Sequence, residues 1–210
     1  MSKELKDFNQ GHIWGRISSF TKKKSDSRQP KPYLFLTIEC ANELYGNVQT
    51  FARLWGEEKI DKFLDYLKQH PHDAYRFIAF FSQYEEQREG KRLSNFTVFK
   101  WMPSTSNELR ASFILRGTIT KTDTIFDELA MRIHVKRESG EGYDPTEEDF
   151  EVYLHPRASF IKGCSREDIK EGSYVEVAGF MRTKEPEDGF GRTSSDVRPY
   201  VMEVELKQPF

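Results

Sequence analysis

Three runs near the start of the chain, residues 13–18, 33–38 and 48–55, alternate between two kinds of side chain. A period of two is typical of a half-buried β-strand. One parity of each run is mostly small or aliphatic and is expected to face a core. The other parity is largely aromatic or basic and is expected to form an outer sheet face, with Trp14, Arg16, Tyr33, Phe35, Phe51, Arg53 and Trp55 as its members.

A register shift of one residue would reverse this assignment, because it moves every side chain of a strand to the opposite face. Aromatic residues are also common in strands for their β-propensity alone. Under that alternative, Tyr33 and Phe51 would be core residues.

The period changes after Gly56, where EEKIDKFLDYLKQHP carries Ile60, Phe63, Leu64 and Leu67 at helical spacing. Acidic residues lie early in this segment and Lys68 lies late, as the helix dipole favours, and Pro71 limits its extension. Two more strand-like runs follow, 75–84 and 96–102. The predicted order is three strands, one helix and two strands.

The same order recurs with a shift of 102 residues, since residues 116–120 repeat the pattern of 14–18. Strands are expected at 129–136, 150–157, 173–182 and 200–207, and a short helical turn at 165–170 with Ser165 as its N-cap. Residues 102–110 form the predicted linker. We therefore expect two domains, 1–104 and 105–210.

Five strands with a helix between the third and fourth is the element order of the OB-fold, a barrel that binds oligonucleotides on the face of its second and third strands. In element order and face chemistry the chain resembles tandem OB-fold single-stranded DNA-binding proteins, most closely those of phages and mobile genetic elements. The resemblance covers nearly the whole chain and involves no diagnostic motif. It implies a mainly β fold of two five-stranded barrels.

Charge separates the two halves, although the whole chain has a net charge of only −2. Residues 1–104 carry 17 Lys and Arg against 13 Asp and Glu, and residues 105–210 carry 15 against 21. The segment 21–31, TKKKSDSRQPK, has five basic residues and one acid, and its Ser, Pro and Lys content predicts a solvated loop. Acidic connections in the second half repel phosphate, so that barrel is expected to serve packing, dimerisation or partner recruitment.

Stacking and electrostatics together suggest how the first half would bind a single strand. Aromatic side chains stack on bases with little regard to sequence, while Lys and Arg follow the phosphates. The candidate stacking residues are Trp14, Tyr33, Phe35, Phe51 and Trp55. The candidate phosphate contacts are Arg16, Lys22, Lys23, Lys24, Arg28, Lys31 and Arg53, with Arg88, Lys91 and Arg92 from the loop between the fourth and fifth strands.

Enzymatic motifs such as GxSxG, HExxH or a P-loop are not found in the sequence, and we expect no catalysis, no cofactor and no metal. The acidic run Glu147, Glu148 and Asp149 has two interpretations, a Mg²⁺ site or, as we expect, a solvated loop. Cys40 and Cys164 do not form a close pair. No apolar run reaches the length of a membrane span, which favours a cytoplasmic protein without a membrane partner.

The sequence thus predicts a non-enzymatic, sequence-tolerant single-stranded DNA-binding protein that acts in DNA replication, recombination or transfer. An RNA-binding OB protein is one alternative. An OB-fold protein-interaction scaffold without nucleic acid is another. A homodimer, which would supply four barrels, and replication or recombination proteins are the further partners considered.

Overall fold

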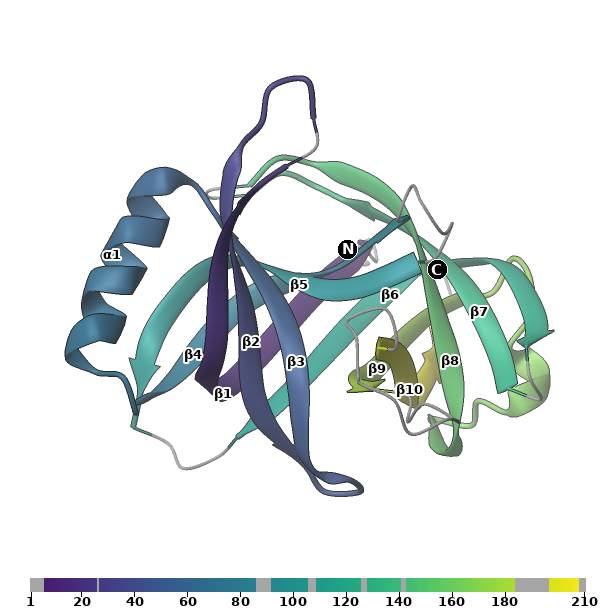
Figure 1. The fold of residues 1–210 in the computed structure, drawn as a ribbon. Coiled ribbons are helices and arrows are strands. Elements are labelled where there is room, and N and C mark those ends of the chain that lie inside the picture. The colour runs from purple at the N-terminus through teal and green to yellow at the C-terminus, as the bar shows by residue number, and fades with distance from the viewer. Residues whose placement is uncertain are drawn as a thin grey trace, which may run out of the picture. The chain divides into compact units, whose positions relative to one another are not determined.

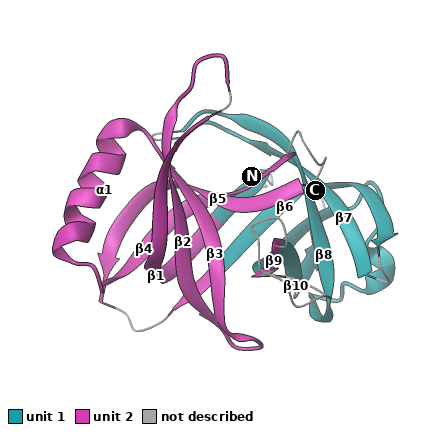
Figure 2. Cartoon of the chain, viewed as in Figure 1, with its two compact units in different colours: residues 1–10, 112–181, 198–210 teal, residues 11–111, 182–197 magenta. Residues whose placement is uncertain are grey.

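The computed structural model describes residues 6–25, 27–85, 92–105, 109–125, 128–140, 143–183 and 197–207. Over these ranges the fold is almost entirely β (Figure 1). Contacts divide it into unit 1, residues 1–10, 112–181 and 198–210, and unit 2, residues 11–111 and 182–197 (Figure 2). The elements are β1 (Phe8–Lys24), β2 (Pro32–Asn42), β3 (Gly46–Trp55), α1 (Glu57–Gln69), β4 (Ala74–Glu85), β5 (Arg92–Ser104), β6 (Arg110–Ile125), β7 (Glu128–Arg137), β8 (Thr146–Ile161), the 3₁₀ turn η1 (Arg166–Asp168), β9 (Tyr174–Thr183) and β10 (Val197–Leu206).

The strands of unit 2 pair into a closed ring. β1 pairs with both β2 and β4 in antiparallel fashion, β2 pairs with β3, and β4 pairs with β5. A parallel pairing of β3 with β5 completes the ring. Helix α1 connects β3 to β4, as the sequence predicts. This mainly β, five-stranded barrel confirms the predicted OB-fold class.

Strands β6 to β10 pair in the same cyclic order. β6 pairs with β7 and β9, β7 pairs with β8, and β8 lies parallel to β10, which neighbours β9. The turn η1 occupies the position of the helix, and Ser165 caps it through hydrogen bonds with Asp168, as the sequence predicts. The predicted division into domains at residue 104 stays a prediction.

The aliphatic parity of the first strands forms the core of unit 2. Leu34, Leu36 and Ile38 of β2 are fully buried, whereas Tyr33 on the opposite parity is partly exposed. Phe51 in β3 is also partly exposed. The strand register is therefore the one predicted, and the shifted alternative is wrong.

Helix α1 covers part of this core with the residues that its periodicity predicts. Ile60, Phe63 and Leu67 are buried, while Leu64 at the edge of the apolar stripe is partly exposed. Gly56 precedes the helix at φ 94°, a left-handed conformation that glycine adopts without steric cost. The helix thus begins and ends where the sequence predicts.

The basic segment 21–31 differs from the prediction, because strand β1 continues through Lys24. Lys22, Lys23 and Lys24 pair with residues 32–34 of β2. The resulting hairpin projects at the top of Figure 1. Backbone pairing satisfies the peptide groups while the lysine side chains stay exposed, so a basic composition does not prevent a strand here. The loop shrinks to residues 25–31.

Other strands also run further than the sequence indicates. The acidic run Glu147, Glu148 and Asp149 lies within β8 and not in the predicted solvated loop, because it pairs with residues 134–136 of β7. The predicted linker 102–110 is shortened at both ends, since β5 reaches Ser104 and β6 begins at Arg110.

Two glycines explain the repeated pattern of 14–18 and 116–120. At Gly15 and Gly117 the first strand of each ring changes its partner, since the next residue pairs with strands on both sides. A Cβ on Gly15 would lie 2.6 Å from the carbonyl oxygen of Glu39, and one on Gly117 would lie 2.0 Å from that of His134. These glycines permit close approach of two backbones.

Replacing Gly117 by Ala is expected to lower the free energy of unfolding by about 1 to 3 kcal/mol, the usual cost of overpacking. The atom that the new methyl group meets belongs to the backbone of β7 and cannot rotate away. Chemical denaturation monitored by circular dichroism measures the change. Gly46→Ala is the control for the loss of a glycine, since open space surrounds Gly46, although its φ of 67° carries a conformational cost of its own. An unchanged stability of Gly117→Ala would contradict the proposed close packing.

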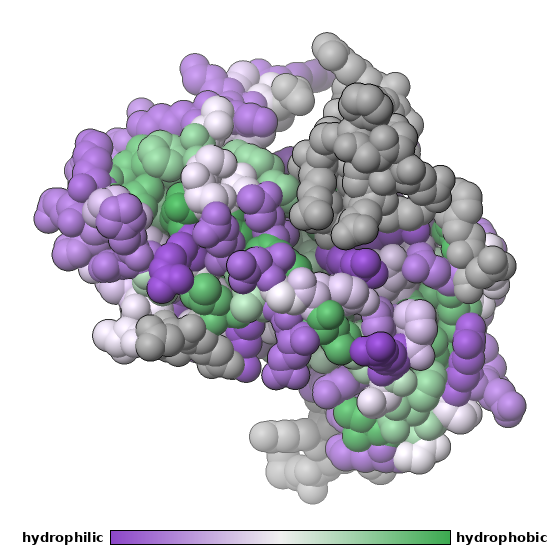
Figure 3. Space-filling view, turned by 60° about the horizontal axis from the view of Figure 1, so that its bottom comes forward, coloured by the Kyte–Doolittle hydropathy of each residue, from purple (hydrophilic) through white to green (hydrophobic). Residues whose placement is uncertain are grey.

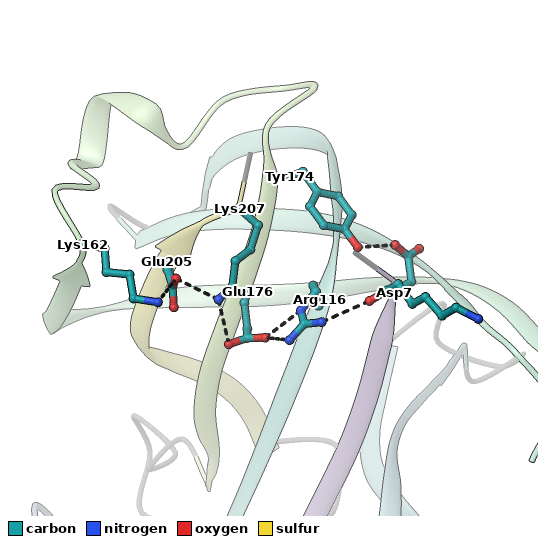
Figure 4. Close-up of polar contacts among 8 residues, drawn as sticks. Asp7, Arg116, Lys162, Tyr174, Glu176, Glu205 and Lys207 are labelled. Atoms are coloured by element: carbon teal, nitrogen blue, oxygen red, sulfur yellow. Dashed lines mark hydrogen bonds and ion pairs between the residues drawn. The ribbon is translucent and has the colours of Figure 1, made fainter. Parts of the chain in front are cut away.

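The N-terminal segment is bound to unit 1 by polar contacts (Figure 4). The carboxylate of Asp7 accepts hydrogen bonds from the Tyr174 hydroxyl at 2.8 Å and the Lys136 amide at 2.7 Å. Arg116 donates to the carbonyl oxygen of Lys6 and forms an ion pair with Glu176. Burial, followed by the contact with Asp7, raises the pKa of Tyr174 above its ordinary value, so its hydroxyl keeps donating to Asp7 over a wider range of alkaline pH.

The same network continues along β10. Lys207 bridges Glu176 at 3.5 Å and Glu205 at 2.8 Å, and Lys162 reaches Glu205 at 2.7 Å. The two lysines lower the pKa of Glu205. Charges of opposite sign therefore alternate from the N-terminal segment to the end of the last strand.

None of the helices in the described ranges is long and apolar enough to cross a membrane.

Candidate nucleic-acid interface

Four of the five predicted stacking residues gather on the outer face of β2 and β3. Tyr33 lies opposite Trp55 in the register, and their ring centroids are 4.7 Å apart. Phe35 and Phe51 stack at 5.7 Å with an interplanar angle of 18°. All four side chains are partly exposed. We call these four residues the aromatic ladder.

Two cations lie on the aromatic ladder. Lys23 of β1 faces Tyr33 in the register, and its Nζ is 4.9 Å from the centroid of Phe35. The guanidinium carbon of Arg53 lies 5.2 Å from the ring of Tyr33 and 3.9 Å from that of Tyr84. Cation–π contacts of this kind hold a guanidinium flat against the sheet. Charge and stacking surface are therefore combined at one place.

A β-bulge between Ile17 and Ser19 decides which lysine joins the ladder. After the bulge, the side chains of Lys22 and Lys24 lie on the opposite side of the hairpin from Lys23, since they face the buried parity of β2. Lys22 forms an ion pair with Asp61 of α1 at 3.2 Å. A pocket of about 300 Å³ at the base of the hairpin is lined by all three lysines, Lys22 to Lys24, and by Tyr33, Glu57 and Asp61. Acidic groups thus offset part of their charge.

The remaining predicted phosphate contacts are more scattered. Arg28 and Lys31 are exposed in the hairpin turn. Arg16 is exposed on the outer face, where it lies opposite Glu39. Arg92 begins β5 opposite Glu85. Arg88 and Lys91 lie outside the described residues.

Trp14 lies apart from the aromatic ladder, because at this point β1 pairs with β4 and not with β2. Its ring stacks on His12 at 5.6 Å, and the guanidinium carbons of Arg76 and Arg110 lie 5.1 and 4.5 Å from its centroid. Burial, then Arg76 and Arg110, lower the pKa of His12, so its imidazole is neutral at pH 7. We call His12, Trp14, Arg76 and Arg110 the Trp14 cluster.

Four residues of these two surfaces, His12, Arg76, Tyr84 and Arg110, are not among the candidates that the sequence pattern predicts. Tyr84 and Arg76 lie in a correctly predicted strand, but their neighbours depend on the pairing of β4 within the ring. Arg110 falls in the predicted linker. A strand prediction that included the ring closure would have placed Arg76 beside Trp14.

The corresponding strands of unit 1 carry ion pairs in place of aromatic rings. His134 of β7 contacts Asp149 at 3.0 Å and Glu147 at 3.2 Å across the pair of strands, and Arg132 lies 3.8 Å from Glu151. The hydrogen bond that the His134 ring donates to Asp149 is the main cause of the raised pKa of His134. Arg132 and His134 already have carboxylate partners, so this face offers less positive charge to a phosphate.

The contacts of the acidic run 147–149 do not support the alternative of a Mg²⁺ site. Glu147 and Asp149 are engaged by His134, and burial raises the pKa of Glu148. Within the described ranges no three His, Cys, Asp or Glu residues are grouped so that they could hold a metal ion. Cys40 is a buried free thiol whose pKa burial raises to about 12.

The surface hydropathy on one face of the protein is mixed. Figure 3 shows hydrophobic residues interspersed among hydrophilic ones and not merged into one broad patch. Phe20 and Leu44 are the large hydrophobic residues that are clearly exposed among those described, at 48% and 39%. Neither belongs to the aromatic ladder.

Comparisons with known proteins match the fold and not the sequence. No family model matches the chain. No curated protein matches it either. The crystal structure of the wild-type single-stranded DNA binding protein from Thermus aquaticus is similar with a TM-score of 0.63 and 13% identity, over 97% of this chain and 95% of that one. A deletion mutant of the same protein gives a TM-score of 0.58 and 13% identity, over 97% and 96%. The chain therefore has the same fold as these structures over nearly its whole length.

Proposed function

We propose that the protein is a non-enzymatic binder of single-stranded DNA that holds bases on the aromatic ladder. The observation that carries this proposal is the combination of four partly exposed rings with Lys23 and Arg53 on one sheet face. A base has a π-face on either side, so stacking is tolerant of sequence, and the cations neutralise the adjoining phosphates. The fold shared with the Thermus aquaticus protein supports the same interpretation.

The first test is a direct titration of the protein with a labelled strand of ~30 nucleotides, long enough for several site sizes of an OB-fold. We expect saturable binding at low salt, with little difference between sequences of mixed composition. Competition with a matched RNA strand decides between DNA and RNA. No binding at low salt would contradict the proposal and favour a protein-interaction scaffold.

Salt dependence provides a separate prediction. If about four phosphates are neutralised, log K should fall with log salt at a slope near −3. Lys23→Gln is expected to make this slope less steep by about 0.7, the value for one phosphate of a single strand. Lys22→Gln, its neighbour in sequence, should leave the slope unchanged because Lys22 faces Asp61 and not the ladder.

Fluorescence anisotropy at four or more salt concentrations measures both slopes. Equal effects of the two lysine substitutions would show that the bulge does not select Lys23, and the basic hairpin would then act as a diffuse charge.

The proposal also includes a biological role, a location in the cell and partners. We infer roles in DNA replication, recombination or transfer, a cytoplasmic location, and a resemblance to the binders of phages and mobile elements. Unit 1, with its paired charges, is assigned to packing, homodimer formation or recruitment of replication or recombination proteins. Sedimentation at several protein concentrations, with and without DNA, tests the homodimer.

A further inference from the structure

The Trp14 cluster has the composition of a phosphate site. Two guanidinium groups lie against one indole, and a neutral His12 stacks on that same ring. The Nε of Arg76 and the Nδ1 of His12 are buried and have no hydrogen-bond partner among the described residues. Buried polar atoms are nearly always satisfied in folded proteins, so two such atoms within one cluster suggest that a ligand completes it.

In the described part of β1, β4 and β5, the residues on the strand rows through His12 and Trp14 are apolar or basic. His12 pairs with Ile78 of β4, which pairs with Lys100 of β5. Trp14 pairs with Arg76, which pairs with Met102. The charges that lower the pKa of His12 are those of the two arginines. These rows therefore carry basic groups, whereas the rows of β7 and β8 carry pairs of basic and acidic residues.

The position of the cluster relates it to the aromatic ladder within unit 2. Both surfaces lie on the outer side of β1, with Trp14 nine residues before Lys23. Extended strand rises about 3.3 Å per residue, which separates these two residues by on the order of 30 Å. Between them the outer row of β1 and β2 contains Arg16 and Glu39. One bound base cannot touch both surfaces, whereas a longer strand can.

The contacts of Trp14 favour a different role from the stacking on bases that its sequence pattern predicts. The guanidinium groups already lie over its ring, so a base does not have free access to the indole. Stacked guanidinium groups keep their N–H groups directed along the ring plane, where they can donate to phosphate oxygens. The indole thus orients the two arginines.

We propose that the Trp14 cluster is a second contact for the sugar–phosphate backbone of a single strand, used when the strand extends beyond the aromatic ladder. The proposal depends on the proposed function, since it assigns a second site to the same ligand. Arg76 and Arg110 bind phosphate oxygens, and Trp14 holds both guanidinium groups in place.

The test compares strands of two lengths, ~4 and ~30 nucleotides, at the lower end of and above the site sizes known for an OB-fold. Arg76→Gln combined with Arg110→Gln should weaken binding of the longer strand roughly tenfold and make its salt slope less steep by about 1.4, the value for two phosphates. Binding of the shorter strand should not change. Lys62→Gln combined with Lys68→Gln, two exposed lysines of α1, is the control that removes the same charge.

A second variant distinguishes the loss of charge from a loss of folding. Arg76→Lys combined with Arg110→Lys keeps both charges and should restore most of the salt slope, and near-ultraviolet circular dichroism checks that each variant is folded. If the wild-type protein binds both strands and the glutamine variant binds the longer strand equally well, that result would overturn the second contact and leave the proposed function intact. An equal loss of affinity for both strands in the glutamine variant would show that the Trp14 cluster does not act separately from the aromatic ladder. No binding by the wild-type protein would refute the proposed function itself.

Discussion

Replacing Phe35 and Trp55 together by alanine is expected to abolish measurable binding of an oligonucleotide while the protein stays folded. Each stacked base contributes roughly 1 to 3 kcal/mol by alanine substitution, so the pair accounts for about 2 to 6 kcal/mol. Affinity should therefore fall at least about 30-fold. The two residues belong to different ring pairs of the ladder, which leaves neither stacked pair complete. Anisotropy titration at constant salt measures the loss.

Phe20→Ala is the matched control for this experiment. Phe20 is 48% exposed on β1, where it faces Leu36 on the other parity of the hairpin. An exposed aromatic residue that lies off the ladder should be replaceable without loss of affinity. Unchanged affinity of the folded Phe35 and Trp55 double variant would mean that the rings do not hold the ligand, and the proposed function would have to be abandoned.

The largest effect on stability is expected from Phe63→Ala in helix α1, about 3 to 5 kcal/mol in the free energy of unfolding. Phe63 is fully buried, and its ring centroid lies 5.0 Å from that of Trp101 and 5.4 Å from that of Tyr75. Truncation leaves a cavity that these large rings cannot fill by a change of rotamer. Because total stability is typically 5 to 15 kcal/mol, the loss is a large fraction of it.

Urea denaturation measures this change, with Leu64→Ala as the control in the same turn of the helix. Leu64 is partly exposed, so its truncation should cost clearly less than that of Phe63. Equal losses would show that helix α1 docks through a broader face than its buried residues indicate.

The alternation of side chains made the barrel face predictable. Leu34, Leu36 and Ile38 could be assigned to the core because a single strand cannot bury both parities when one carries Tyr33 and Phe35 together with polar neighbours. Helix α1 was predictable for a similar reason, since its buried positions recur at helical spacing. In both elements, the pattern that predicts the structure lies in the same short segment that forms it.

Features that depend on pairing between distant strands could not be predicted in the same way. The bulge between Ile17 and Ser19 leaves no local pattern, yet it moves Lys23 to the ladder and turns Lys22 toward α1. Trp14 has the outward parity that the sequence predicts, but the ring closure gives it β4 as a neighbour and not β2. Parity predicts the face of a strand, and the adjoining strand determines the surface that forms there.

The anchoring of the N-terminal segment has a consequence for synthesis on the ribosome. Asp7 emerges from the ribosome before its partner Tyr174, which is made 167 residues later. At 5 to 20 residues per second, the segment waits for roughly 10 to 30 s before its binding site exists. Gly11 to Ala111, by contrast, can close their own ring as soon as β5 is complete. Asp7 thus reaches its native place later than the ring of unit 2 can close, so loss of the Asp7 carboxylate would affect β7 and β9 more than the aromatic ladder.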